Sequence, residues 1–273
     1  MLTYPEIDPV ILHIHGNLAI RWYSLAYIFG FILSYCFFRS QNRKLKIMED
    51  KLCDKFITFI IVGVVAGARI FDCFFYHFLE TIKEPSSILR TWEGGMSFHG
   101  GVIGVFLAVC IFSKKYKINA FKITDLCVVV VPIALCFGRI TNFINGELYG
   151  NITYTSPFRM IFPDDYTGQP RHPSQLYEAF TEGICLFVIM FFFFKKTKAI
   201  QKTGILSCCF GVFYSIARFI CEFFRRPEID NFINLTAGQW LSLIMFSISL
   251  GVLIYLNTNN KRFFADKARS NEL

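Results

Sequence analysis

Long apolar stretches recur along the whole chain, and they restrict its possible folds more than any other feature. A transmembrane helix needs about 20 mostly apolar residues, and stretches near this length lie at about 18–38, 56–75, 97–112, 126–143, 176–194, 204–224 and 238–256. A backbone in hydrocarbon must satisfy its hydrogen bonds internally, which favours helices. The sequence therefore predicts an all-α, polytopic membrane protein. We expect a bundle of seven transmembrane helices that forms a single integral membrane domain over residues 1–273.

The overall composition agrees with a membrane protein. Of the 273 residues, 54% are hydrophobic and 18% are aromatic, which is more apolar than a soluble domain of this size usually is. The ten cysteines show no metal-binding spacing, so we interpret them as small buried hydrophobic residues. Residues 1–17 contain Glu6 and Asp8 but no lysine or arginine, which predicts that no cleavable signal peptide is present.

The basic residues are distributed unevenly between the two sides of the expected bundle. The segments 39–55, 113–124, 195–203 and 257–273 contain 18 lysines and arginines, whereas the segments 1–17, 77–96, 144–175 and 225–237 contain 6. Positive charge gathers on the cytoplasmic side of membrane proteins. The N-terminus is therefore expected outside and the C-terminus inside, with 257–273 as a polar cytoplasmic tail. This distribution explains the net charge of +8 without a nucleic-acid partner.

Several charged side chains fall inside or at the ends of the expected spans. Tyr214, Arg218, Glu222 and Arg225 are spaced 4, 4 and 3 residues apart, which places them on one face of a helix. Such a polar stripe should face the bundle interior or a wet cavity. Two interpretations stay open: an internal arginine–glutamate clamp between helices, or one arginine that is held by Glu222 while the other meets a substrate.

Two further features lie on the expected outer side. The stretch 138–150 carries Arg139 at the end of an apolar run and then two asparagines, a glutamate and two more glycines. Two interpretations are open for this stretch. It is either a binding site for an anion at the membrane surface or an ordinary loop whose one arginine snorkels to the interface. His99 lies between Phe98 and two glycines, where a span enters from outside. A neutral histidine there could act as a general base or have a structural role.

Six segments, in order along the chain, carry a common set of motifs. They are Arg21-Trp22-Tyr23, Gly94-Gly95-Met96-Ser97-Phe98-His99-Gly100-Gly101, Gly138-Arg139-Ile140-Thr141-Asn142-Phe143-Ile144-Asn145-Gly146-Glu147-Leu148-Tyr149-Gly150, Arg171-His172-Pro173-Ser174-Gln175-Leu176-Tyr177-Glu178, Glu222-Phe223-Phe224-Arg225-Arg226-Pro227 and Gly238-Gln239. Together, over nearly the whole chain, they resemble one bacterial family, the prolipoprotein diacylglyceryl transferases. One departure is Thr141, which stands where the family usually has glycine.

The resemblance implies an enzyme of the inner membrane, with its active site towards the outer leaflet. Such enzymes transfer the sn-1,2-diacylglyceryl group of phosphatidylglycerol to the lipobox cysteine of a prolipoprotein signal peptide, and glycerol phosphate leaves. By the same resemblance, His99, Arg139 and Arg218 are the catalytic candidates. The implied substrate-binding residues are Tyr23, Arg139, Asn142, Glu147, Gly150, Glu222 and Arg225. Neither a cofactor nor a metal is implied.

Two other function classes compete with this interpretation. A transporter or channel for an anionic solute would also explain buried arginines, but it should show an inverted repeat or paired broken helices. A membrane scaffold that binds lipid would need neither a base nor a deep arginine. Product formation from phosphatidylglycerol and a lipobox peptide distinguishes all three classes.

Overall fold

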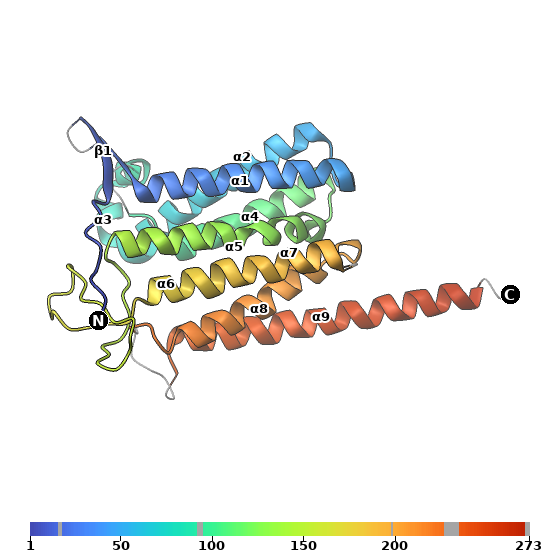
Figure 1. Cartoon of the computed structure of the whole chain (residues 1–273). Coiled ribbons are helices and arrows are strands. Elements are labelled where there is room, and N and C mark those ends of the chain that lie inside the picture. Colours follow the sequence, from blue (N-terminus) through green and yellow to red (C-terminus); the bar gives the residue numbers. More distant parts are fainter. Residues whose placement is uncertain (16–17, 92–94, 198, 227–234, 271–273) are drawn as a thin grey trace. The chain divides into compact units, whose positions relative to one another are not determined.

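A computed structural model describes residues 1–15, 18–91, 95–197, 199–226 and 235–270 (Figure 1). Gly94 of one matched segment and Pro227 of another lie outside the described residues. The chain divides into two compact units, which are described separately. One unit contains Met1–Ser34 and Asp125–Leu273, and the other contains Tyr35–Thr124.

Helices account for most of the described chain. The long ones are α1 (Trp22–Leu45), α2 (Asp50–Phe71), α4 (Phe98–Tyr116), α5 (Ala120–Ile144), α8 (Ile205–Cys221) and α9 (Ala237–Ser270). Another helix begins as α6 (Ser174–Glu178), widens into a π-helical turn (Ala179–Cys185) and continues as α7 (Leu186–Lys196). After α2 come a π-helical turn (Asp72–Tyr76), the short α3 (Phe78–Lys83) and a 3-10 turn (Pro85–Leu89), and a further 3-10 turn (Ala199–Gln201) precedes α8.

Four helices among the described residues are long and apolar enough to cross a membrane. They are Asp50–Tyr76, Ala120–Ile144, Ser174–Lys196 and Ala237–Thr258, and Ile205–Cys221 is a shorter apolar helix. The apolar stretches of the sequence thus fold as helices, as internal satisfaction of backbone hydrogen bonds requires. The described chain is mostly helical and contains helices that can cross a membrane, which agrees with the expected all-α membrane protein.

The first expected span differs from the structure at its start. Residues Leu18–Arg21 form strand β2, which pairs antiparallel with β1 (Val10–His15). Helix α1 begins only at Trp22, whose backbone N–H donates to the carbonyl of Pro9 and whose indole N–H donates to that of Asp8. Short apolar runs do not distinguish a strand from a helix by periodicity, and for this reason the hairpin was not predicted.

In the second unit, α2 and α4 pack through glycines. A methyl group added to Gly63 would lie 2.6 Å from the carbonyl oxygen of Gly104, and one added to Gly104 would meet the Gly63 carbonyl even more closely. Only glycine permits backbones to approach so closely. Ser97 caps α4 by accepting a hydrogen bond from the N–H of Gly100, and its own N–H donates to Ala68 of α2. These contacts fix the start of α4, where His99 lies.

In the first unit, the segment between α5 and α6 folds over a small apolar cluster. Phe143, Met160 and Phe162 form its buried part, and the hydroxyl of Tyr4 donates to the carbonyl of Phe143 at 2.6 Å. A buried ion pair, Arg171 Nε to Asp165 Oδ2 at 2.6 Å, stabilises the segment. These contacts hold the segment between the end of α5 and the start of α6 in place.

Helix α8 is held against α5 at its other end. The carboxylate of Asp125 in α5 accepts hydrogen bonds from the backbone N–H of Gly204 at 2.6 Å and of Ser207 at 2.8 Å. A carboxylate at a helix N-terminus accepts hydrogen bonds from backbone N–H donors that have no partner within the helix. This anchor fixes the start of the helix that carries Arg218.

Candidate active site

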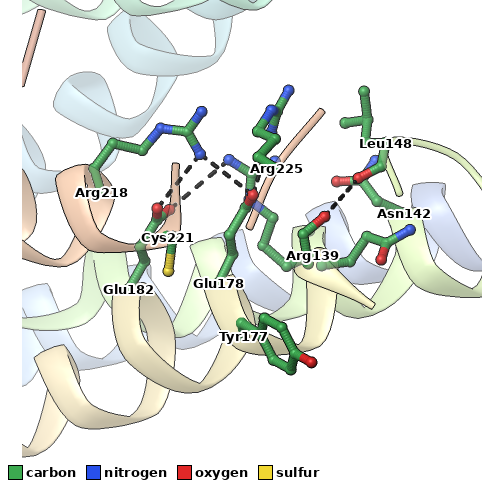
Figure 2. Close-up of polar contacts among 12 residues, drawn as sticks. Arg139, Asn142, Leu148, Tyr177, Glu178, Glu182, Arg218, Cys221 and Arg225 are labelled. Carbon is green, nitrogen blue, oxygen red and sulfur yellow. Dashed lines mark hydrogen bonds and ion pairs between the residues drawn. The ribbon is translucent and has the colours of Figure 1, made fainter. Parts of the chain in front are cut away.

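In the first unit, six charged side chains gather near the C-terminal ends of α5 and α8 and near the start of the helix that begins with α6. Figure 2 shows Arg139, Glu178, Glu182, Arg218 and Arg225 of this group, which we call the arginine–glutamate cluster. Its members are Arg139, Glu178, Glu182, Arg218, Glu222 and Arg225. The three carboxylates are almost completely buried, and the three guanidinium groups retain between 11% and 18% exposure. The arginines are therefore the groups that solvent or a ligand can reach.

Glu178 is the shared counter-ion of all three arginines. Its Oε2 lies 2.7 Å from Nε of Arg139. Its Oε1 lies 3.4 Å from Nη1 of Arg218 and 3.3 Å from Nη1 of Arg225. One carboxylate thus joins α5, α8 and the chain that follows α8, which offsets the mutual repulsion of three clustered cations.

Glu222 and Arg218 form the pair that their spacing of four residues predicts. Nη2 of Arg218 lies 2.7 Å from Oε2 of Glu222, and the hydroxyl of Thr236 donates to Oε1 of Glu222 at 3.0 Å. The expectation that Arg225 lies on the same helical face is wrong, because α8 ends at Cys221 and Arg225 lies in the following chain, where it contacts Glu178. Both arginines are thus paired with carboxylates, as the clamp interpretation expects, with Glu222 holding Arg218 and Glu178 holding Arg225.

A close contact between α5 and the π-helical turn Ala179–Cys185 brings Arg139 to Glu178 and Glu182. A methyl group on Gly183 would lie 2.5 Å from Cβ of Cys136. Cys136 and Arg139 are three residues apart and lie on the same face of α5. Gly183 therefore allows the face that carries Arg139 to approach the helix that carries Glu178 and Glu182.

Asn142 and Glu147 meet directly at the end of α5. The side-chain amide of Asn142 donates to Oε1 of Glu147 at 2.7 Å, and the amide of Asn145 donates to the same oxygen at 3.2 Å. The amide of Gln175 donates to the backbone carbonyl of Glu147 at 2.6 Å. Glu147 itself is exposed. Two amides thus orient a carboxylate that can accept hydrogen bonds from hydroxyl groups.

Gly150 lies among backbone segments rather than at an open surface. Its N–H donates to the carbonyl of His172 at 2.9 Å, and it forms an antiparallel bridge with Arg225. The next residue, Asn151, donates through its N–H to Phe224. This arrangement gives Gly150 a role in positioning the chain around Arg225. Burial also lowers the pKa of His172, which favours a neutral imidazole beside these contacts.

Thr141 fits its position although the family pattern has glycine there. Its hydroxyl donates to the carbonyls of Phe137 at 3.0 Å and Gly138 at 2.8 Å, one turn earlier in α5. Such a bond satisfies a buried hydroxyl within its own helix. The departure from the pattern therefore leaves no unpaired polar group beside Arg139.

His99 and Tyr23 lie apart from the arginine–glutamate cluster along the chain. His99 is exposed on the first turn of α4 in the second unit, with its ring centroid 6.4 Å from that of Phe71. Tyr23 is exposed on the first turn of α1, within the first unit. The structure therefore brings together Arg139, Arg218, Glu222 and Arg225, and it places Asn142, Glu147 and Gly150 on the adjoining chain.

Sequence reasoning missed Glu178 and Glu182 as site residues. Glu178 is the last residue of a matched segment, and Glu182 lies outside all matched segments, so neither was predicted to contact the arginines. The available signal was two glutamates four residues apart in an otherwise apolar span, since ionisable residues at membrane depth face the bundle interior and find partners. Among the described residues, no group of histidine, cysteine, aspartate and glutamate side chains has the arrangement of a metal site.

These features define a helical membrane protein with a buried arginine–glutamate cluster next to an amide-oriented carboxylate. Guanidinium groups are suited to phosphate because their planar fork donates two parallel hydrogen bonds. The chain belongs to the prolipoprotein diacylglyceryl transferase family, whose model matches residues 9–255.

Curated relatives are similar over nearly the full chain. The chain is 45% identical over 264 residues to proteins named phosphatidylglycerol–prolipoprotein diacylglyceryl transferase from Rickettsia akari (strain Hartford), Rickettsia felis (strain ATCC VR-1525 / URRWXCal2) and Rickettsia rickettsii (strain Sheila Smith). Each alignment covers 95% of this chain and 100% of the relative.

Proposed function

We propose that the chain transfers the diacylglyceryl group of phosphatidylglycerol to the lipobox cysteine thiol of prolipoproteins. The observation that carries the proposal is the gathering of Arg139, Arg218 and Arg225 around Glu178, in a chain of this family. Three guanidinium groups at the end of membrane-spanning helices are suited to a lipid phosphate.

The reaction exchanges one bond for another at the glyceryl carbon. The cysteine sulfur forms a bond to this carbon, the bond from carbon to the phosphate oxygen breaks, and glycerol phosphate leaves with the electron pair. The thiol proton must pass to a base, for which His99 is the candidate. Arginines aimed at the leaving phosphate stabilise the negative charge that develops on it. Arg139 and Arg218 have this role in the proposal, with Arg225 as a third phosphate contact.

The remaining site residues bind and orient the lipid in this proposal. Glu147, held by Asn142 and Asn145, accepts hydrogen bonds from glycerol hydroxyls. Gly150 and Glu222 keep Arg225 and Arg218 in place, and Tyr23 lies at the membrane boundary, where aromatic side chains prefer to be.

The protein is proposed to lie in the bacterial inner membrane with its site towards the outer leaflet. Seven spanning helices form one integral domain, with the N-terminus outside and residues 257–273 as a cytoplasmic tail. The support for this orientation is the count of 18 basic residues against 6 on the two sides.

The proposed function is tested with purified full-length protein, phosphatidylglycerol vesicles and a synthetic lipobox peptide. We expect release of glycerol phosphate and a peptide whose mass increases by one diacylglyceryl group. A peptide with serine in place of the lipobox cysteine is the matched control and should give neither product. Anion flux through proteoliposomes without any thioether product would contradict the proposal and would favour a transporter.

A further inference from the structure

Glu182 differs from the other two carboxylates of the arginine–glutamate cluster in how it contacts the arginines. Glu178 and Glu222 each have an oxygen 2.7 Å from a guanidinium nitrogen. The nearest arginine contacts of Glu182 are longer, at 3.5 Å to Nη1 of Arg218 and 3.8 Å to Nη2 of Arg139. Glu178 and Glu222 each also accept one hydrogen bond through Oε1, from Arg225 and Thr236, so Glu182 is the weakly paired member.

The surroundings of Glu182 also oppose an ionised carboxylate. Its side chain is 0% exposed, and neither of its oxygens accepts a hydrogen bond within the described part of the chain. A buried carboxylate is costly unless it is paired and hydrogen-bonded. A protonated carboxyl group avoids most of that cost.

Every neighbouring element has a titratable or charged group near Glu182. Arg139 approaches from α5, and Arg218 approaches from α8. Tyr214 and Cys221 of α8 interact with it electrostatically. On its own helix, Glu178 lies one turn earlier and carries a like charge. When two carboxylates share a site, the one with fewer cationic partners takes the proton.

The charge balance of the cluster points in the same direction. With all three glutamates ionised, the three arginines and three carboxylates of the cluster cancel. With one glutamate neutral, one net positive charge remains for an anion. Within a buried site of low polarity, that charge favours a phosphate diester strongly.

We propose that Glu182 is held as a neutral carboxylic acid, so that the arginine–glutamate cluster keeps one net positive charge for the lipid phosphate. Glu178 and Glu222 remain ionised and position the arginines. Glu182 is then a positioning residue that fills the space between Arg139 and Arg218 without neutralising them. The inference rests on the proposed function only for the identity of the anion.

The test compares Glu182→Gln with Glu178→Gln in the full-length protein, since both variants replace a carboxyl group by an amide of nearly the same shape. An amide mimics a neutral acid, so Glu182→Gln should lower kcat/KM for phosphatidylglycerol by at least about tenfold less than Glu178→Gln does. Glu178→Gln removes an ionised partner of three arginines and should lower kcat/KM by about 100-fold or more.

A second readout does not depend on activity. The infrared spectrum of the wild-type protein should contain the carbonyl stretch of a protonated carboxylic acid, and the Glu182→Gln spectrum should lack that band. Equal losses of activity in both variants, no such band, or failure of Glu182→Gln to fold would each overturn the inference. A wild-type protein that shows the band but makes no product would contradict the proposed function and leave the neutral Glu182 intact.

Discussion

Nε of Arg139 lies 2.7 Å from Oε2 of Glu178, and this contact joins α5 to α6 at the centre of the arginine–glutamate cluster. This ion pair involves the Nε edge of the guanidinium group, and the planar fork retains its Nη donors. Lysine has the same charge but a single ammonium group, so it cannot hold Glu178 and face a phosphate in the same geometry.

Arg139→Lys should therefore lose most of the transfer activity although the charge is preserved. Loss of one such contact costs about 2–4 kcal/mol of transition-state stabilisation, or roughly 30- to 1000-fold in rate. The measurement is kcat/KM with phosphatidylglycerol and a lipobox peptide. Arg226→Lys, at an exposed position next to Arg225, is the matched control and should retain activity. Near-normal turnover of a folded Arg139→Lys protein would assign Arg139 a structural role only.

His99→Gln should slow transfer at neutral pH and leave lipid binding intact. A free thiol with a pKa near 8.5 is only a few per cent thiolate at pH 7, and a general base contributes about 10²–10⁴-fold. The defect should shrink as the pH approaches the pKa of the thiol, because hydroxide then removes the proton. The measurement is a pH–rate series with lipid binding in parallel. A defect that is equal at every pH, or a loss of lipid binding, would show that His99 positions the lipid or the helix start.

Gly104→Ala should destabilise the α2–α4 pair, whereas Gly101→Ala in the same helix should not. Alanine ordinarily favours a helix over glycine by about 1 kcal/mol, but the added methyl on Gly104 would collide with the backbone of Gly63. Overpacking of this kind costs about 1–3 kcal/mol. The nearest atom to a methyl on Gly101 would be 3.9 Å away, an ordinary contact. Thermal unfolding in detergent compares the two, and equal melting temperatures would contradict the observed packing.

Asp165→Asn should loosen the segment between α5 and α6 at neutral pH. Hydrogen bonds from Arg171 lower the pKa of Asp165 to about 2. Because the folded pKa is lower than the unfolded value of roughly 3.9, the ion pair contributes its full stability above pH 4 and loses it as the pH falls through about 2. Hydrogen exchange of residues 145–173 should be faster in the variant at pH 6, with the difference vanishing towards pH 2. Asp164→Asn, at the exposed neighbouring position, should match wild type, and equal protection in all three proteins would refute the role of the pair.

A C-terminal fusion tests the proposed orientation. A reporter enzyme that is active only in the periplasm should be silent after residue 273, because the basic segments are expected on the cytoplasmic side. The same reporter at the N-terminus, with its own export signal, is the positive control. Activity of the C-terminal fusion would invert the orientation and move the arginine–glutamate cluster to the other leaflet.

The sequence by itself determined the class of fold and part of the site. Apolar runs near the length of a membrane helix require internally bonded backbone, so they predict helices without any tertiary information. The spacing of Arg218 and Glu222 likewise predicted their pairing, because residues four apart on a helix are neighbours. The ordered motifs predicted the family, to which the chain belongs.

The tertiary structure alone decided which carboxylates from other helices meet the arginines. Arg139, Glu178 and Arg218 come from three helices, and the distance between side chains on different helices depends on packing, which local periodicity does not encode. The close contact of Gly183 with Cys136 lets α5 approach the helix that carries Glu178 and Glu182, and so brings these glutamates to Arg139. The pairing of β1 with β2 was missed for a related reason, since short apolar runs become strands only through pairing with each other.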